Sequence, residues 1–252
     1  MKLNDSQTFP IGLNRNLRFF LTNPAPCPYL PGKRERKAFT SLAVSDSDVL
    51  HNSLSQSGFR RSQGIAYRPA CPACNACRSV RVDAQGFTFS RNQRRVISRN
   101  MDLVRNPVPA NPTRTQFRLL KTYLKGRHDG GGMSDMTYRD YVNMVADSPV
   151  RSVIFEYRLN DAPDAPLVAC AITDVLRDGL SMVYTFFDPR QSRRSLGKMM
   201  ILDHIRQVKT LGLPHVYLGY WIKGSDKMDY KRDYTPLEVL DGESWRPLKD
   251  TE

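Results

Sequence analysis

Apolar and polar positions along the chain follow two spacings, one of strands and one of helices. Apolar and charged residues alternate over 80–83, which predicts a half-exposed strand. Strand-like segments at 151–160 and 167–176 flank the turn DAPDAP, so we expect a hairpin followed by a third strand at 179–189. The last two predicted elements are a helix from Leu196 to about Leu211 and a strand at 214–222.

The first hundred residues have a different texture. The segment AFTSLAV predicts a short strand after a basic turn, and SDSDVLHNSLSQSG predicts a short helix. Residues 90–105 predict a basic helix that ends before the prolines at 107, 109 and 112. Because helical spacing resumes from residue 113, with helices expected after it and at 137–146, we predict two domains: 1–112, basic and cysteine-containing, and 113–252.

The order of the later elements predicts the fold class. Antiparallel strands that lead into strand–helix–strand are the layout of Gcn5-related N-acetyltransferases. We therefore expect an α+β fold with a mixed, mostly antiparallel sheet flanked by helices, plus a cysteine-rich N-terminal region. Arg194 and Gly197 match the pyrophosphate loop of that fold, but Met199 stands where a small residue is needed. A coenzyme-A-dependent N-acetyltransferase is therefore one alternative function.

Positive charge is concentrated in the first two-fifths of the chain. The chain has 38 Lys and Arg residues and 25 Asp and Glu residues. Residues 1–100 contain 16 of the basic residues and only 5 of the acidic ones. Such a basic segment favours a nucleic-acid partner, although a generally basic surface is the alternative. No run approaches the roughly 20 apolar residues of a membrane span, and the N-terminus lacks a secretory signal, so we expect a cytoplasmic protein without membrane contact. The candidate phosphate-binding residues are Lys33, Arg34, Arg36, Lys37, Arg91, Arg94, Arg95 and Arg99. Of these we expect Lys33, Arg34, Arg94 and Arg95 to bind the tRNA.

Four cysteines form a set with metal-ligand character. Cys71, Cys74 and Cys77 repeat at every third residue, and Cys27 supplies a fourth sulfur. Four thiolates suit Zn²⁺ or an iron–sulfur cluster, and unmetallated thiols are the remaining alternative. Cys170 lies in the apolar run LVACAITDV and is expected in the core. Together with the charge, the set also allows a non-catalytic, metal-containing nucleic-acid binder.

A series of short motifs resembles one family. CPYLPGKRER, GFRRS, YRPACPACNAC, YTFFDP, SLG, YLGYWI and MDYK occur in the order seen in the arginyl-tRNA–protein transferase family, from Cys27 to about Lys231. The chain is most similar to the bacterial branch, which uses leucyl-tRNA; arginyl-tRNA stays open as the donor. The resemblance implies transfer of leucine to the N-terminal α-amine of proteins that begin with Asp or Glu, which creates an N-degron. It implies no cofactor for the chemistry.

The resemblance also directs the choice of site residues. An acidic N-terminal residue requires a positive pocket, for which we expect Arg60, Arg61 and Lys231. Asp188 or Asp174 is expected to orient the α-ammonium group and accept its proton. The aminoacyl end of the tRNA is expected near Tyr220, Trp221, Leu196 and Gly197.

Overall fold

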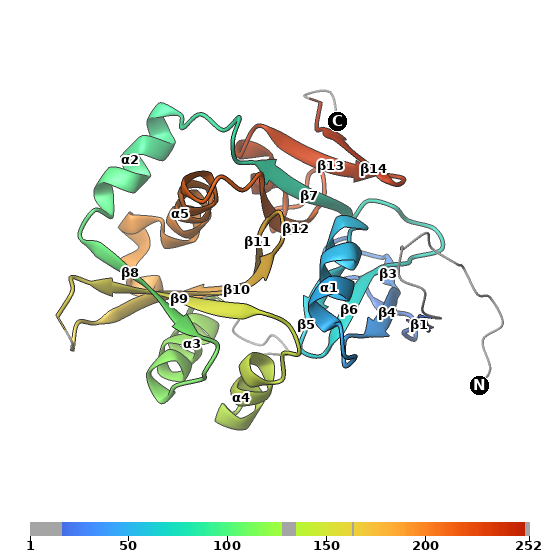
Figure 1. Cartoon of the computed structure of the whole chain (residues 1–252), viewed down its shortest axis with the longest axis horizontal. Helices are drawn as coiled ribbons and strands as arrows, with labels where there is room; N and C mark the ends of the chain where they lie inside the picture. The colour runs from blue at the N-terminus through green and yellow to red at the C-terminus, as the bar shows by residue number, and fades with distance from the viewer. Residues whose placement is uncertain (1–16, 128–134, 163, 250–252) are drawn as a thin grey trace.

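An eight-stranded mixed sheet forms the centre of the molecule (Figure 1). The computed structural model describes residues 17–127, 135–162 and 164–249. None of the helices in these ranges is both long and apolar enough to cross a bilayer. Across the sheet the order is β14 (Ser244–Pro247), β13 (Leu237–Asp241), β7 (Arg78–Asp83), β12 (His215–Trp221), β11 (Gly179–Phe187), β10 (Leu167–Leu176), β9 (Ser152–Leu159) and β8 (Leu103–Pro109).

One strand pair in this sheet is parallel, and it separates early. β11 and β12 pair over Gly179–Ser181 and His215–Tyr217, whereas the other neighbours are antiparallel. Beyond these pairs β11 and β12 continue without further pairing to each other in the described residues. The expected α+β fold with a mostly antiparallel sheet is therefore confirmed, and it contains a split between two parallel strands.

Helices cover both faces of the sheet (Figure 1). Alternate residues of β10 reach opposite faces: Ala169 and Ala171 pack in the cluster of α5, and Cys170 and Ile172 in the cluster of α3 and α4. This double burial explains why β10 reads as a continuous apolar run, and it confirms Cys170 as a core residue. The helices are α3 (Arg114–Arg127) and α4 (Tyr138–Ala146) on one face, and α5 (Leu196–Thr210) with α2 (Arg91–Arg99) on the other.

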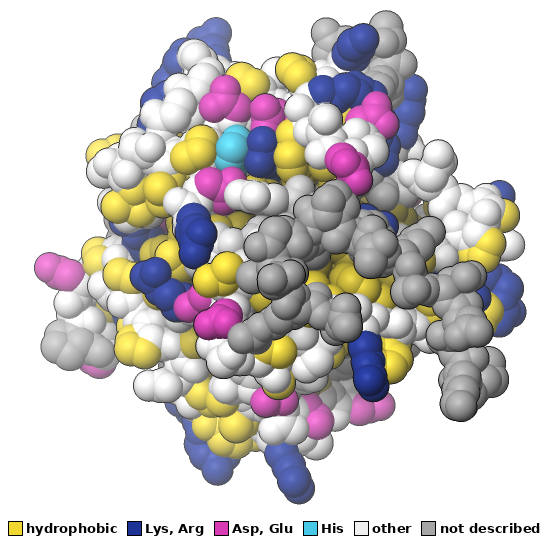
Figure 2. Space-filling model, turned by 45° about the vertical axis from the view of Figure 1, so that its right-hand side comes forward, with side chains coloured by type: hydrophobic (Ala, Val, Ile, Leu, Met, Phe, Trp, Pro, Cys, Tyr) yellow, Lys and Arg dark blue, Asp and Glu magenta, His cyan; other side chains and the backbone are white. Residues whose placement is uncertain are grey.

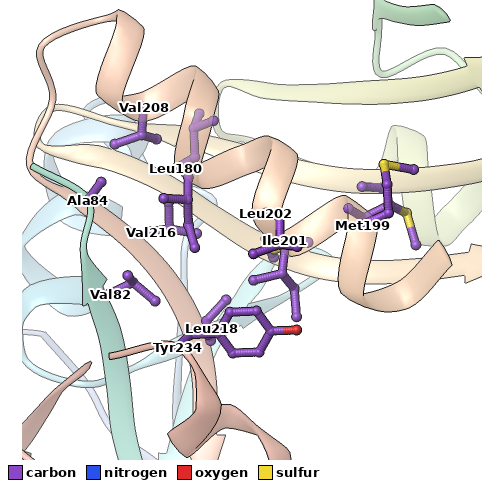
Figure 3. Packing of buried hydrophobic residues seen from close by; sticks show 14 of the residues in the cluster. Val82, Ala84, Leu180, Met199, Ile201, Leu202, Val208, Val216, Leu218 and Tyr234 are labelled. Atoms are coloured by element: carbon purple, nitrogen blue, oxygen red, sulfur yellow. The ribbon is translucent and has the colours of Figure 1, made fainter. Parts of the chain in front are cut away.

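The larger core lies between α5 and the sheet. Figure 3 shows apolar side chains of α5 gathered with those of β7, β11 and β12. Met199 is among them and is buried, so its side chain fills the core beneath the start of α5. The labelled α5 residues of this cluster are Met199, Ile201, Leu202 and Val208, and the labelled strand residues are Val82, Leu180, Val216 and Leu218.

A smaller lobe is built from the N-terminal segment. Its four strands are antiparallel, and α1 (Ser47–Gln56) packs Leu50 and Leu54 into a small core with Phe59. This lobe carries the GFRRS and YRPACPACNAC motifs to one end of the large sheet. Its strands are β1 (Phe20–Leu21), β4 (Lys37–Ser41), β6 (Ile65–Pro69) and β5 (Arg60–Ser62), and a separate pair is formed by β2 (Ala25–Pro26) and β3 (Arg34–Glu35).

One prediction about the elements needs correction, and one hairpin was not predicted. The basic helix α2 ends at Arg99, and the next residues form β8, an edge strand that accommodates Pro107 and Pro109 because it pairs on one side alone. The hairpin of β13 and β14 was not predicted; β13 pairs with β7. The division at residue 112 stays a prediction: β7 and β8 precede it yet lie in the large sheet, and residues 1–16 lie outside the described ranges.

Candidate active site

The split between β11 and β12 receives the side chain of Arg60 from β5. The Arg60 guanidinium donates to Ser181 Oγ over 3.3 Å and to the carbonyl oxygen of Met182. On the facing strand Gly219 has φ of 81°, and a Cβ at this position would lie 2.9 Å from Arg60 Nε. Glycine is needed at position 219 for two reasons: the backbone is left-handed, and a side chain would collide with the Arg60 guanidinium.

Lys231 is hydrogen-bonded to β12, the second strand of the split. It lies on the short helix η2 (Asp229–Asp233), is 5% exposed, and its ammonium donates to the carbonyl oxygen of Tyr220. Burial, together with the nearby charge of Arg60, lowers the pKa of Lys231 to about 7. Arg60 and Lys231 are thus near each other, each bound to a carbonyl of a different strand.

Tyr220 connects this split to the small lobe. Its hydroxyl donates to the carbonyl oxygens of Tyr67 over 2.9 Å and Gly58 over 3.2 Å. Burial raises the pKa of this hydroxyl well above 10, so it stays a donor. Arg68 is near enough to influence Tyr220 electrostatically, and its guanidinium lies over the Phe59 ring at 5.1 Å. We call Tyr220, Arg60, Arg68, Cys77 and Lys231 the Tyr220 cluster.

A cavity of about 770 Å³ opens beside this cluster. Asp241 is the one acid among the described residues that line it, and it is bonded to Arg246 over 2.7 Å. Arg60 and Lys231 do not line the cavity; they lie behind Tyr220, which does. Trp221 also lines it and donates its indole N–H to Asp229 over 2.9 Å. The basic residues of the wall are Arg68, Arg78, Lys223 and Arg246.

Asp174 lies in a separate, fully paired network. Its carboxylate is 0% exposed and accepts two bonds of 2.7 Å from Arg61, one of 3.0 Å from His51 Nε2 and one of 2.8 Å from Ser152. Burial alone would raise the pKa of Asp174, but the bonds from His51 and Arg61 lower it to about 2. We call Asp174, Arg61, His51 and Ser152 the Asp174 network.

The expected roles of Arg61 and Asp174 stay predictions, and this geometry disfavours both. The two side chains neutralise each other inside the protein, so Arg61 has its carboxylate partner within the chain. A carboxylate with a pKa of about 2 is a weak proton acceptor at neutral pH.

Asp188 lies where β11 leads into the short helix η1 (Pro189–Arg194). Its side chain caps η1 by accepting from the Arg190 backbone N–H over 3.0 Å, and it pairs with the Arg190 guanidinium over 2.9 Å. The bond from Arg190 lowers the pKa of Asp188. Its catalytic role stays a prediction. Directly after η1, Leu196 is buried and Gly197 lies against the Phe187 ring at the start of α5.

The four basic residues expected to bind tRNA lie on two distant elements. Lys33 and Arg34 are exposed at the β2–β3 pair, and Arg34 donates to the carbonyl oxygen of Pro24 over 2.7 Å. Arg94 and Arg95 are exposed on α2, and Arg94 donates to the carbonyl oxygen of Phe89 over 2.7 Å. On the face drawn in Figure 2, basic and acidic side chains are interspersed. Net charge by itself therefore does not locate a binding surface.

The four motif cysteines are half-buried free thiols, and three of them are near enough to Cys77 to influence it. Burial raises the pKa of Cys77 to about 11, and the other three thiols act in the same direction. The backbone N–H of Arg36 lies 3.4 Å from Cys71 Sγ. In the described ranges no three His, Cys, Asp or Glu side chains are arranged to hold a metal ion, so the metal stays a prediction.

Arg68, His51 and Ser152 belong to these sites and were not singled out from the sequence. Arg68 lies within the motif YRPACPACNAC, where attention falls on the cysteines, and its position three residues before Cys71 was the available signal. His51 is far from Asp174 in the sequence and carries no local pattern that connects the two.

Sequence comparisons place this geometry in a family. A family model described as "Arginine-tRNA-protein transferase, N terminus" matches residues 25–95, and the corresponding "C terminus" model matches 115–241. A Hyphomonas neptunium protein named "Aspartate/glutamate leucyltransferase" is 69% identical over 252 residues, 100% of each chain. A Phenylobacterium zucineum protein of the same name is 54% identical over 95% of this chain and 93% of its own.

Two solved structures superpose on part of the chain. L-PGS from Bacillus licheniformis superposes with a TM-score of 0.47 and 12% identity, over 85% of this chain and 71% of that one. FemX superposes with a TM-score of 0.47 and 8% identity, over 76% and 64%. The relationship itself comes from the sequence matches, which cover nearly all of the chain. The chain belongs to the arginine-tRNA-protein transferase family.

Proposed function

We propose that this protein transfers leucine from leucyl-tRNA to the N-terminal α-amine of polypeptides that begin with Asp or Glu. The observation that carries the proposal is the Tyr220 cluster, whose Arg60, Arg68 and Lys231 lie together beside a cavity with a basic wall. Relatives at 54–69% identity bear the name aspartate/glutamate leucyltransferase, which supports both the donor and the acceptor. The product would carry an N-degron, and we place the reaction in the cytoplasm.

The reaction needs little acid–base assistance. The neutral α-amine attacks the carbonyl carbon of the leucyl ester, a C–N bond forms, and the C–O bond to the ribose breaks. The proton lost by the amine ends on the released ribose hydroxyl. An N-terminal amine has a pKa of about 7.7–8.0, so about one in ten is already neutral at pH 7. Most of the acceleration can therefore come from holding ester and amine together, worth up to roughly 7–11 kcal/mol.

The acidic side chain of the acceptor would bind at the basic wall of the cavity. Arg68 and Arg78 line that wall, and an arginine can hold a carboxylate through two parallel N–H bonds. Arg60 and Lys231 lie behind Tyr220 and add positive potential in a low-dielectric setting. Selection for Asp or Glu would follow because a neutral first residue cannot form charge-assisted bonds with the arginines of this wall.

We retain the four motif cysteines as a proposed site for Zn²⁺ or an iron–sulfur cluster. Thiolates are suitable ligands for both, and Cys27, Cys71 and Cys74 are near enough to Cys77 to raise its pKa. A metal bound there would hold the cysteine loop, which contributes Cys77 and Arg78 to the cavity. No step of the transfer depends on it.

The test supplies one radiolabelled donor at a time to the purified protein. Leucyl-tRNA, arginyl-tRNA and acetyl-CoA are each incubated with peptides that begin with Asp, Glu or Ala. Label is expected from leucyl-tRNA in the Asp and Glu peptides alone. Label from acetyl-CoA would favour an N-acetyltransferase, which the Arg194–Asp102 pair disfavours. Transfer from no donor would favour the non-catalytic nucleic-acid binder.

A substitution at Arg68 tests the acceptor pocket. Arg68→Gln is expected to raise KM for the Asp peptide by about tenfold or more, because a charge-assisted bond of about 1.5–3 kcal/mol is lost. KM for leucyl-tRNA should change little. Arg139→Gln, at an exposed position of α4, is the matched control. Equal KM values for the Asp peptide in wild type and Arg68→Gln would contradict the assignment.

A further inference from the structure

Helix α2 presents a basic outer face. Val96 and Ile97 pack against the core cluster of α5, and Figure 1 shows α2 alongside α5. At 3.6 residues per turn, Arg91 and Arg95 fall on the side opposite this apolar pair. The helix contains no Asp or Glu, so its outer face has uniform positive charge.

Both ends of α2 are bonded to segments that follow the two separating strands. Near its start, Gln93 Nε2 donates to the carbonyl oxygen of Asp233 over 3.1 Å, at the end of η2, which comes after β12. At its end, Asn100 Nδ2 donates to the carbonyl oxygen of Arg194 over 2.9 Å, in η1, which comes after β11. Arg99 donates to the carbonyl oxygen of Arg193. Helix α2 is thereby fixed beside the open end of the split.

The neighbouring elements extend this positive face. Arg193 on η1 and Lys198 on α5 are exposed, as are Arg91 and Arg95. Within the part of the chain that the structure describes, the side chains of these four residues have no carboxylate partner. Arg194 differs, because it is paired with Asp102 over 2.7 Å and so connects the turn before β8 to η1. We call Arg91, Arg95, Arg193 and Lys198 the α2 surface.

We propose that the α2 surface binds the phosphate backbone of the donor tRNA next to its aminoacylated end. This inference rests on the proposed function and locates the donor. Arginine and lysine bind phosphates by charge-assisted bonds, and backbone binding requires a set of cations that no protein acid neutralises. RNA held on α2 would lie beside the split, because both ends of the helix are bonded to the segments that leave it.

The burial pattern of α2 favours nucleic acid over an anionic membrane. A helix that lies on a bilayer inserts its apolar face among the lipids. The apolar face of α2 is already packed against the protein core through Val96 and Ile97. A polyanion that needs positive charge alone therefore suits this face better.

The experiment compares two triple variants with equal loss of charge. Arg91→Gln/Arg95→Gln/Arg193→Gln removes three cations of the α2 surface. Arg118→Gln/Arg139→Gln/Arg151→Gln removes three exposed cations elsewhere and is the control. We measure KM for leucyl-tRNA, KM for the Asp peptide, and the affinity for uncharged tRNA at several KCl concentrations.

The α2 variant is expected to raise KM for leucyl-tRNA by about tenfold or more, with KM for the peptide unchanged. The slope of log affinity against log salt should become shallower by about 2–3, since each phosphate contact contributes about 0.7–0.9. A control variant that loses as much tRNA affinity would overturn the proposal. So would tighter binding of wild type to phosphatidylglycerol vesicles than to tRNA. An inactive wild type that still binds tRNA through α2 would refute the proposed function and leave this surface standing.

Discussion

Two buried polar regions lie side by side and differ in how their charge is balanced. In the Asp174 network, the Arg61 guanidinium meets a carboxylate that also binds His51 and Ser152. In the Tyr220 cluster, Arg60 and Lys231 are bonded to carbonyl oxygens, and the groups that perturb the pKa of Lys231 include no carboxylate. Arg60 and Arg61 are consecutive in one strand, yet Arg61 is paired with a carboxylate and Arg60 is bonded to a hydroxyl and a carbonyl oxygen.

The difference separates a structural site from a binding site. A buried ion pair with all its hydrogen bonds made needs nothing from outside the chain. Arg60 and Lys231 are held by a hydroxyl and by carbonyl oxygens, so their burial costs stability that an incoming carboxylate can offset. The Asp174 network therefore holds β5 against the sheet, and this fixes the adjacent Arg60 in the split. We therefore expect an acidic ligand to bind most favourably next to the Tyr220 cluster.

The largest effect is expected from breaking the balanced region. Asp174→Asn leaves the buried Arg61 charge unpaired and should lower the free energy of unfolding by about 3–5 kcal/mol. Urea denaturation at pH 7 measures this, and Asp161→Asn, at an exposed turn, is the control. A loss below about 1 kcal/mol would show that the network does not hold the lobe.

Removing a cation from the unbalanced region should have the opposite sign. Lys231→Met is expected to raise the free energy of unfolding at pH 7 by about 1–4 kcal/mol, because a buried charge without an acid is replaced by an apolar chain. Transfer to Asp peptides should fall at the same time. Lys227→Met, at an exposed position, should change neither quantity. A Lys231→Met protein less stable than wild type would refute the comparison.

The same lysine predicts a pH dependence. The folded pKa of Lys231 is about 7 and the ordinary value is 10.5, so the unfolded chain binds more protons between these pH values. Stability should therefore rise with pH from about 7 towards 10, and the rise should be smaller in Lys231→Met. Denaturation midpoints at pH 7, 8 and 9 for both proteins provide the measurement.

Acid should weaken the balanced region. The pKa of Asp174 is lowered from 3.8 to about 2, so its stabilisation is complete above about pH 4 and is lost as pH falls through 2. The contribution is about 2 kcal/mol. The stability difference between wild type and Asp174→Asn should narrow from pH 5 to pH 3. A constant difference over this range would argue against the low pKa.

The smallest effect is expected at the point where the split meets Arg60. Gly219→Ala places a Cβ against the Arg60 guanidinium and requires a left-handed alanine, at a cost of about 1–2 kcal/mol. Because Arg60 must move, kcat should fall by more than this stability loss explains. Gly212→Ala, which has a similar φ of 68° and open space, separates the two contributions.

Patterns local in the sequence predicted the fold well. The strands of the central hairpin and α5 were evident because β10 and β11 are long apolar runs and α5 has helical spacing. β8 was missed because Pro107 and Pro109 are unusual within a strand. The β13–β14 hairpin was missed because it depends on pairing with β7, which is distant in the sequence. Strand pairing between distant segments leaves no local pattern.

For the site, the motifs identified which residues gather and could not assign their partners. Arg60, Tyr220, Lys231 and Cys77 lie near one another although they come from four motifs, GFRRS, YLGYWI, MDYK and the cysteine motif. Arg60 and Arg61 are equivalent in the sequence. Successive residues of a strand point to opposite sides, so β5 sends one to Ser181 and the other to Asp174.

The sequence by itself determined the family, the sheet-and-helix composition and the basic character of the N-terminal lobe, because each is written in adjacent or periodically spaced residues. The tertiary structure alone decided which charges are neutralised. Arg61 and Asp174 form an ion pair although they are 113 positions apart in the sequence. The energy of a charge in a protein depends on the groups within a few ångströms of it, and only the fold brings those groups together.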